Sequence, residues 1–427
     1  MRSPFAPLAL AVLCSHLSLA QSQAQPSSSP APTAVALPVS QALTLRQALR
    51  LTLTHNPDLA AARLELQAME AAEIQAGARP NPELGLLVED TRGSSRTTTL
   101  QWSQPIELGP KRAARLEAAA RAREQAAVAL QAKQAELRAA VSSGFFEVLG
   151  AQEQVKVGEA MLELARNASS IATKRLQAGK VPPLEQAKAQ VAEAGVRAEW
   201  VQAQSELVLA RQRLASLWGQ GQGSVEQIDG RADLPPEPPS ATELAERMAQ
   251  APAVRLARLD IAKRQAQTLG ERAKRVPDLT FTLGAKRDVE LGRTQAVVGL
   301  SIPLPLLDSN QGNLLEALRR EEQARELLTA VTLRLQADVA QTSERLRQTR
   351  QQALTLRTEV LPTAQSAYDA AVKGYELGKF SLMDVLDAQR TLFQLRQQQL
   401  RSSAEAYRAS AELDRLLAPR QDDLNQE

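Results

Sequence analysis

Two short stretches decide the fold: Arg79-Pro80-Asn81-Pro82-Glu83-Leu84, and Arg275-Val276-Pro277-Asp278-Leu279. They are corresponding points of an internal duplication, and Gly179-Lys180 recurs in the same way as Gly378-Lys379. The offset between the copies stays between about 195 and 199 residues, whereas solenoid repeats have periods of ~20 to 50 residues. We therefore predict two copies of one large structural unit around a pseudo-symmetry axis. The predicted repeats are residues 43–231 and 232–427.

The first repeat has the pattern helix, β-hairpin, very long helix, tight turn and return helix. Apolar residues recur at helical spacing from Leu43, Asn56-Pro57 interrupts that helix, and it resumes to about Ala78, where the prolines of the first stretch end it. Leu84, Leu86 and Val88 then share one face of an alternating segment, as Leu100 and Trp102 do after a Gly-Ser turn. The predicted ranges are 83–107 for the hairpin, 111–178 for the long helix, 179–183 for the turn and 184–218 for the return helix.

The second repeat follows the same order. Pro362 lies inside its long helix and should kink or break it, because proline cannot donate the helical hydrogen bond. The predicted ranges are 241–275 for the first helix, 278–305 for the hairpin, 313–375 for the long helix, 378–381 for the turn and 382–417 for the last helix.

Composition supports long helices in place of several compact domains. Aromatic residues make up only 3% of the 427 residues, and coiled-coil seams need few bulky side chains. At 1.5 Å per residue, the predicted helix over 111–178 would be roughly 100 Å long. Apolar residues seven apart predict left-handed supercoils; the two sets are Val141, Val148, Val155 and Leu162, and Leu354, Leu361, Tyr368 and Tyr375.

The four predicted strands pose a closure problem. Strands of about ten residues can cross a bilayer when tilted, but open sheet edges cannot lie in lipid. Several copies must therefore pool their strands, and a trimer would supply twelve. Trp102 and Phe281 are the predicted aromatics of the membrane interface. The predicted fold class is mainly α with a small β part: an antiparallel α-helical coiled-coil barrel plus four membrane β-strands per chain.

The N-terminus has the features of a signal peptide over residues 1–20. Arg2 precedes an apolar run, and small residues precede a predicted cleavage after Ala20. Residues 21–42, rich in Gln, Ser, Pro and Ala, are predicted to be a flexible linker. Cys14, the only cysteine, follows Leu13 in place of the small residue of a lipoprotein signal. We therefore predict no lipidation and no disulfide.

Other function classes find no support in the sequence. The net charge of +3 comes from 51 basic and 48 acidic residues that are interleaved along the helices, a pattern of solvated faces and not of nucleic-acid binding. His55 is the only histidine after the leader, and the methionines are scattered, so we predict no metal site and no cofactor. No nucleophile–base pattern and no phosphate-binding loop is present. We predict that the protein is not an enzyme.

The chain resembles the TolC-like outer membrane efflux proteins over about residues 43–418. Two segments, Ala78-Arg79-Pro80-Asn81-Pro82-Glu83 and Gln104-Pro105-Ile106-Glu107-Leu108-Gly109-Pro110-Lys111-Arg112, are similar to the cobalt–zinc–cadmium resistance branch of that family. That branch usually has Gly-Gly-Lys-Arg where this chain has Gly109-Pro110-Lys111-Arg112.

The resemblance implies an outer membrane location with a large periplasmic part in a Gram-negative bacterium. It implies a homotrimer whose twelve-stranded barrel continues into a periplasmic α-barrel. It also implies a periplasmic adaptor and an inner-membrane pump of the resistance–nodulation–division type as partners, with heavy-metal cations as cargo. Two alternatives remain: a channel for drugs or secreted proteins, and a periplasmic coiled-coil adaptor or scaffold.

The resemblance also suggests a periplasmic gate. Asp384 and Asp387 share a helix face and would form two carboxylate rings in a trimer, which favours cations. The alternative for Asp384 is helix capping with Ser381. Tyr375 matches a tyrosine that helps to hold the family's closed mouth, although it could equally be a seam residue. Glu185 matches an acid of the first turn, where capping is the favoured alternative.

The two turns would form the inner tip, and by resemblance they would contact the adaptor. The residues of this set are Gly179, Lys180, Val181, Gly378, Lys379 and Phe380. Phe380 departs from the basic tether that some members have there, so the tethered closing mechanism is not expected in this chain.

Overall fold

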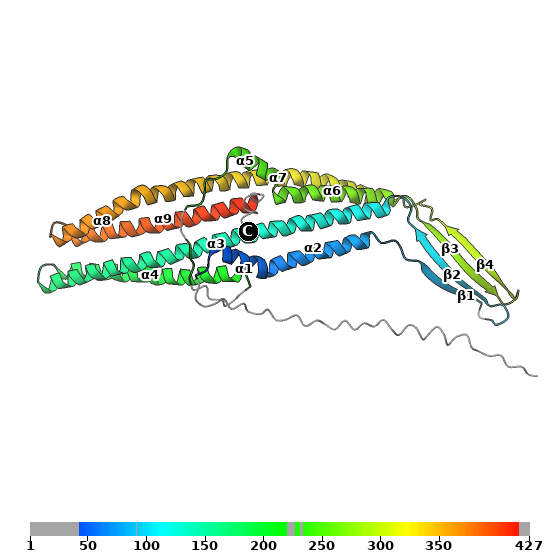
Figure 1. Ribbon diagram of the computed structural model, residues 1–427, viewed down its shortest axis with the longest axis horizontal. Coiled ribbons are helices and arrows are strands. Elements are labelled where there is room, and N and C mark those ends of the chain that lie inside the picture. Colours follow the sequence, from blue (N-terminus) through cyan, green and yellow to red (C-terminus); the bar gives the residue numbers. More distant parts are fainter. Residues whose placement is uncertain (1–41, 91, 220–226, 231–233, 418–427) are drawn as a thin grey trace, which may run out of the picture. The chain divides into compact units, whose positions relative to one another are not determined.

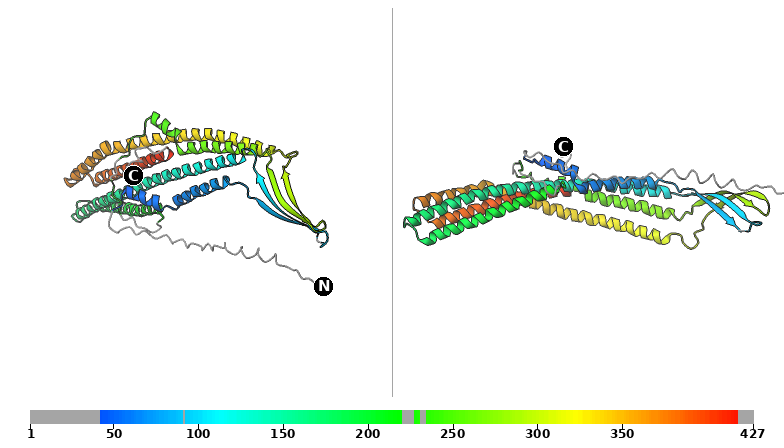
Figure 2. Two further views of the ribbon diagram at one scale, coloured as in Figure 1. Left: turned by 45° about the vertical axis from the view of Figure 1, so that its right-hand side comes forward. Right: turned by 90° about the horizontal axis from the view of Figure 1, so that it is seen from below.

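The computed structural model describes residues 42–90, 92–219, 227–230 and 234–417. The predicted signal peptide, nearly all of the predicted linker and the boundary between the two predicted repeats lie outside the described residues. Figures 1 and 2 show the strands together beyond one end of the long helices, and the two helix–helix turns beyond the other end.

The first half begins with two short helices. Helix α1 (Leu45–His55) starts at a capping box, in which Thr44 and Gln47 satisfy each other's backbone N–H groups. Helix α2 (Pro57–Ala76) starts directly afterwards with proline at its first position, where no N–H is needed. Between them the Asn56 side chain accepts from the Leu59 amide and donates to the carbonyl of Leu217, which connects this elbow to the end of α4.

The rest of the first half contains two strands and two long helices. Strands β1 (Glu83–Glu89) and β2 (Thr97–Ile106) form an antiparallel pair. Helix α3 (Lys111–Gln177) is 67 residues long, and α4 (Pro183–Ser216) packs against it.

The second half opens with a break that we did not predict. We expected one helix over residues 241–275, but the structure has α5 (Ala241–Ala249) and α6 (Pro252–Ala273). The residue before a proline avoids the helical region, and Ala251 is extended with ψ of 141°. Pro252 follows Pro57 by 195 residues (252 − 57), so the break repeats the α1–α2 elbow.

The remaining elements are strands β3 (Leu279–Asp288) and β4 (Arg293–Ser301), and helices α7 (Gln311–Thr355), α8 (Leu361–Glu376) and α9 (Leu382–Leu416). A π-helical turn, η1 (Leu356–Val360), separates α7 from α8. Pro362 follows this turn, and a π turn is one way in which a helix accommodates a missing N–H. The expected interruption at Pro362 is therefore present.

The π turn also corrects one seam residue. We expected Leu354 in the seam with Leu361, Tyr368 and Tyr375, but its side chain is 36% exposed. Ala353 is fully buried instead. A π turn takes one more residue than an α turn, so the buried position upstream of it shifts by one residue.

Three buried clusters hold the helices together. The first joins α1, α3 and α4 around Val141, Val148 and Leu214. The second joins α3, α4, α8 and α9 at the turn end, and the third joins α7 and α9 with the start of α6 around Val339 and Leu413. Helix α3 of the first half packs against α4 and also against α6 and α9 of the second half. The two halves are therefore packed together through their helices.

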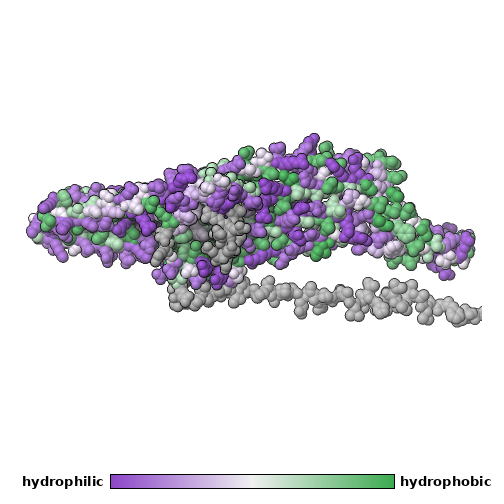
Figure 3. Space-filling model, turned by 45° about the horizontal axis from the view of Figure 1, so that its top comes forward, coloured by the Kyte–Doolittle hydropathy of each residue, from purple (hydrophilic) through white to green (hydrophobic). Residues whose placement is uncertain are grey.

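The sheet has the order β1-β2-β3-β4, and all of its pairs are antiparallel. Directly paired residues point to the same face, so the register assigns the faces. One face carries apolar rows, such as Leu84, Trp102, Leu283 and Val298. The opposite face carries polar residues, among them Gln101, Ser103, Thr282 and Gln295. Figure 3 shows hydrophobic residues gathered at this end of the chain, with hydrophilic residues beyond them.

The apolar face is exposed, since Leu84, Val298 and Leu300 each have more than half of their surface accessible. Trp102 and Phe281, the two predicted interface aromatics, both lie on this face. In the part of the chain that the structure describes, no helix is long and apolar enough to cross a membrane.

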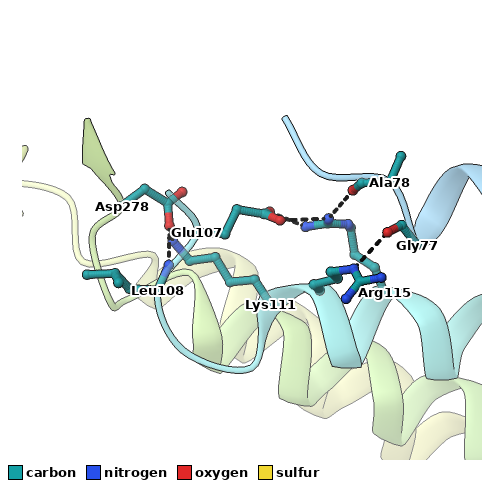
Figure 4. A network of polar contacts seen from close by, with 8 residues as sticks. Gly77, Ala78, Glu107, Leu108, Lys111, Arg115 and Asp278 are labelled. Atoms are coloured by element: carbon teal, nitrogen blue, oxygen red, sulfur yellow. Dashed lines mark hydrogen bonds and ion pairs between the residues drawn. The ribbon is translucent and has the colours of Figure 1, made fainter. Parts of the chain in front are cut away.

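A polar network links the strands to the helices (Figure 4). Lys111 pairs with Asp278 of the second half at 2.6 Å, and the same carboxylate accepts from the Leu108 amide. Arg115 pairs with Glu107, and its hydrogen bond holds the pKa of the Glu107 carboxyl below its ordinary value. The motif around Lys111 is therefore a clasp at the β2–α3 junction.

Gly284 gives a test of the sheet. A Cβ at this position would lie 2.6 Å from the Leu100 carbonyl oxygen and 3.1 Å from the Gln101 Cα. Because backbone atoms cannot move aside cheaply, we expect Gly284→Ala to destabilise the protein by about 1–3 kcal/mol. The readout is the denaturation temperature of the purified protein.

Gly299→Ala is the matched control on the neighbouring strand, because its Cβ would meet Thr282 at an ordinary 3.5 Å. The same denaturation temperature for both variants would contradict the register described above.

Candidate functional site

The candidate site lies where the α3–α4 and α8–α9 hairpins meet at their turns. Buried residues of all four helices form one cluster there, so the two hairpins are packed as a unit. Its members include Met161, Ala172, Ala189, Tyr368, Leu382 and Phe393.

Both turns have the same glycine-based ending. Gly179 has φ of +68° and Gly378 has φ of +74°, values that residues with a side chain rarely adopt. The Lys180 amide donates to the Arg175 carbonyl at 2.9 Å, and the Lys379 amide donates to the Gly374 carbonyl at 2.8 Å. These are Schellman-type bonds that satisfy the last carbonyls of α3 and α8.

In the second turn, an aromatic side chain packs directly against a buried glycine. Phe380 packs against Gly374 so closely that a Cβ on Gly374 would lie 2.0 Å from the ring. Gly374 is buried, while Phe380 remains 51% exposed. The ring therefore covers the end of α8 and still offers its outer face to solvent.

Tyr375 connects the two hairpins. It is 4% exposed, and the Arg175 guanidinium lies 4.3 Å from its ring centroid. Arg175 also donates to the Tyr375 carbonyl at 3.2 Å, and the Tyr375 hydroxyl lies 3.4 Å from Glu185 Oε1. Tyr375 is thus a seam residue by burial, and three contacts connect it to residues of α3 and α4.

Asp384 and Asp387 are both exposed on α9. Asp384 forms a capping box with Ser381, accepting from its amide and its hydroxyl at 2.8 Å. The hydroxyl bond first, and the amide bond second, hold the pKa of the Asp384 carboxyl below its ordinary value. The stabilisation from this cap is present above the ordinary pKa of aspartate and is lost as the pH falls through the lowered one.

Residues of the two turns line an open pocket of about 430 Å³. Its charged side chains are Arg175, Lys180, Glu185 and Lys188, so basic groups outnumber acidic ones. Of the predicted tip residues, Val181 is half-buried and Lys180 and Lys379 are exposed.

The sequence reasoning missed two residues of this site, Arg175 and Gly374. Arg175 could have been identified as a basic residue in the last turn of α3, where a positive charge interacts favourably with the helix dipole. Gly374 could not be identified from the sequence, because Phe380 contacts it only in the folded turn. Among the described residues, no group of three or more His, Cys, Asp or Glu side chains could hold a metal ion.

A sheet with one apolar and one polar face is the pattern of transmembrane β-barrel strands, and two packed helical hairpins lie at the other end of the chain. The model of the outer membrane efflux protein family matches residues 48–220 and again residues 244–418. The chain belongs to this family. Its place is therefore the outer membrane, and the predicted family and fold class are confirmed.

Individual relatives agree with this assignment. The chain is 42% identical to the cobalt-zinc-cadmium resistance protein CzcC of Cupriavidus metallidurans, over 98% of this chain and 100% of that protein. It is 28% identical to the nickel-cobalt-cadmium resistance protein NccC of Alcaligenes xylosoxydans xylosoxydans, over 69% and 68% of the two chains. The solved outer-membrane channel OprN has a similar fold, with a TM-score of 0.75, 21% identity and coverage of 88% and 90%.

Gly374→Ala tests the second turn. The added methyl group must displace the Phe380 ring, so we expect the turn to open locally at a cost of about 1–3 kcal/mol. Faster proteolytic cleavage at residues 376–381 is the readout.

The double variant Gly374→Ala, Phe380→Ala removes the clash and should be cleaved at the rate of Phe380→Ala alone. If Gly374→Ala accelerates cleavage equally in both backgrounds, the ring does not rest on this glycine.

Proposed function

We propose that this chain forms the outer membrane channel of a tripartite resistance–nodulation–division system that exports heavy-metal cations. The similarity to CzcC carries the proposal, because it extends over 98% of this chain. It therefore includes the four strands at one end as well as the helical turns at the other. The channel conducts passively and performs no catalysis. A periplasmic adaptor and an inner-membrane proton-driven pump supply the cargo and the energy.

The sheet edges support a homotrimer. In the described chain, β1 and β4 each pair on one side only, and unpaired edges cannot lie in hydrocarbon. Three chains would supply twelve strands with the apolar face toward lipid and the polar face toward the lumen. The helices would continue as a periplasmic α-barrel. The repeats 43–231 and 232–427 would each contribute half of one subunit's wall.

The tip would be the gate. Tyr375, Arg175 and Glu185 hold α8 against α3 and α4, so opening the mouth by moving the α8–α9 hairpin breaks these contacts. In a trimer Asp384 and Asp387 would form carboxylate rings, and within each chain the Ser381 hydroxyl and amide bonds favour the charged form of Asp384. Such rings favour cations. The adaptor would contact the exposed turn residues Gly179, Lys180, Gly378, Lys379 and Phe380 together with the half-buried Val181.

A resistance assay tests the cargo. We expect deletion of the gene to sensitise its host to cobalt, zinc and cadmium, and the intact chain to restore resistance. The measurement is the minimal inhibitory concentration of each metal beside a panel of drugs. Sensitivity to drugs with unchanged metal tolerance would reject metal export in favour of a drug or protein channel.

Single-channel recording tests the carboxylate rings. Asp384→Asn plus Asp387→Asn removes both charges, while an asparagine side chain at position 384 can still accept the capping bonds through its amide oxygen. We expect the preference for cations over anions, read from the reversal potential in a salt gradient, to fall.

Glu322→Gln plus Glu326→Gln is the control, because it removes the same charge from exposed positions of α7. An ion preference that is unchanged in the aspartate variant, or lowered equally in the control, would exclude Asp384 and Asp387 as the selective rings.

A further inference from the structure

The linker between β4 and α7 presents an exposed aliphatic segment. Residues 302–307 read Ile-Pro-Leu-Pro-Leu-Leu. The exposed fractions of Leu304, Leu306 and Leu307 are 74%, 84% and 98%. An exposed patch of apolar side chains marks a surface that contacts another protein or a membrane.

The corresponding linker of the first half shows that the fold does not require this exposure. Between β2 and α3 the chain is clasped by polar contacts, with the Leu108 amide on Asp278 and Glu107 on Arg115 (Figure 4). Apolar residues occur there too, but Ile106 and Leu108 are only 42% and 37% exposed, and Glu107 separates them. The uninterrupted and more exposed aliphatic segment is thus a feature of the second half.

The segment continues the apolar face of the sheet. It follows Val298 and Leu300, which are 69% and 66% exposed on that face. It ends at polar residues: the Asn310 amide donates to Asp308 Oδ1, and the Asn310 side chain donates to the Glu271 carbonyl of α6. Figure 3 shows hydrophobic residues gathered in this part of the chain. The segment therefore lies between the exposed apolar strands and the polar start of α7.

The backbone of the segment suits a surface with little water. Pro303 and Pro305 have no N–H group, and the Leu306 amide donates to the Leu304 carbonyl at 2.9 Å. Fewer free donors lower the cost of contact with hydrocarbon. Interfaces between protein chains, by contrast, combine apolar contacts with a polar rim, and residues 302–307 carry no polar side chain.

We propose that residues 302–307 rest in the membrane leaflet on the helix side of the barrel, with their leucines among the acyl chains just below the headgroups. This inference depends on the proposed membrane channel. Outer membrane barrels usually anchor this boundary with aromatic residues, whereas this chain has only three Trp and three Tyr. The aliphatic segment anchors the channel at that boundary in their place.

Site-directed spin labelling tests the location. In a Cys14→Ser background, Leu307→Cys would be labelled with a nitroxide and the protein reconstituted in phospholipid vesicles. Collision rates with oxygen, which enters lipid, and with a water-soluble nickel chelate are then compared. Leu86→Cys on the apolar face is the lipid control, and Leu377→Cys, a leucine of the tip that is 64% exposed, is the water control.

We expect residue 307 to favour oxygen over nickel, as residue 86 does, and residue 377 to show the reverse. If the nickel chelate reaches residue 307 while residue 86 still favours oxygen, the proposed anchor is wrong but the proposed channel stands. Shielding of 307 from both reagents also overturns it, because a second copy of the chain would then cover the segment. Water exposure at 86 contradicts the proposed channel itself. Leu306→Cys repeats the test if the first variant does not assemble.

Discussion

The unpaired edges of the four-stranded sheet constrain the rest of the molecule. The sheet has an apolar face that is largely exposed and two strands, β1 and β4, that each pair on one side only in the described chain. Backbone groups without partners are costly in hydrocarbon, so this sheet is compatible with a membrane only after its edges are paired. In the proposed assembly, the helices serve that requirement by bringing three sheets into one ring and by forming the wall below it.

The duplication repeats the architecture and varies the chemistry. Both halves have a proline elbow, a hairpin, a long helix and a glycine turn. The strand-to-helix linkers differ: a charged clasp holds the first, and the second is aliphatic. The tips differ as well, since Phe380 on Gly374 covers the second turn. Each difference lies where the two halves would meet different surroundings, namely neighbouring strands, lipid, or the mouth of the channel.

The family was identified by the resemblance of short segments, and sequence patterns were sufficient for the fold class, because period-two and period-seven spacing survive in single segments. They were insufficient where tertiary contacts decide. The π turn before Pro362 moved burial from Leu354 to Ala353, and heptad counting assumes uninterrupted α-helix. The break at Pro252 was detectable through its offset from Pro57. For Asp384, the capping role is present in the structure, whereas the proposed gate role would require neighbouring subunits. Arg175 joined the site only because α3 and α8 are adjacent.

The number of chains in the assembled particle tests the central claim most directly. Native mass spectrometry of the protein extracted from membranes in mild detergent gives this number. The account predicts a particle with three times the mass of the mature chain, which dissociates on heating. A protein that remains monomeric and binds neither detergent nor lipid would contradict it. Such a protein would be stable in water with its sheet edges unpaired and its leucines exposed.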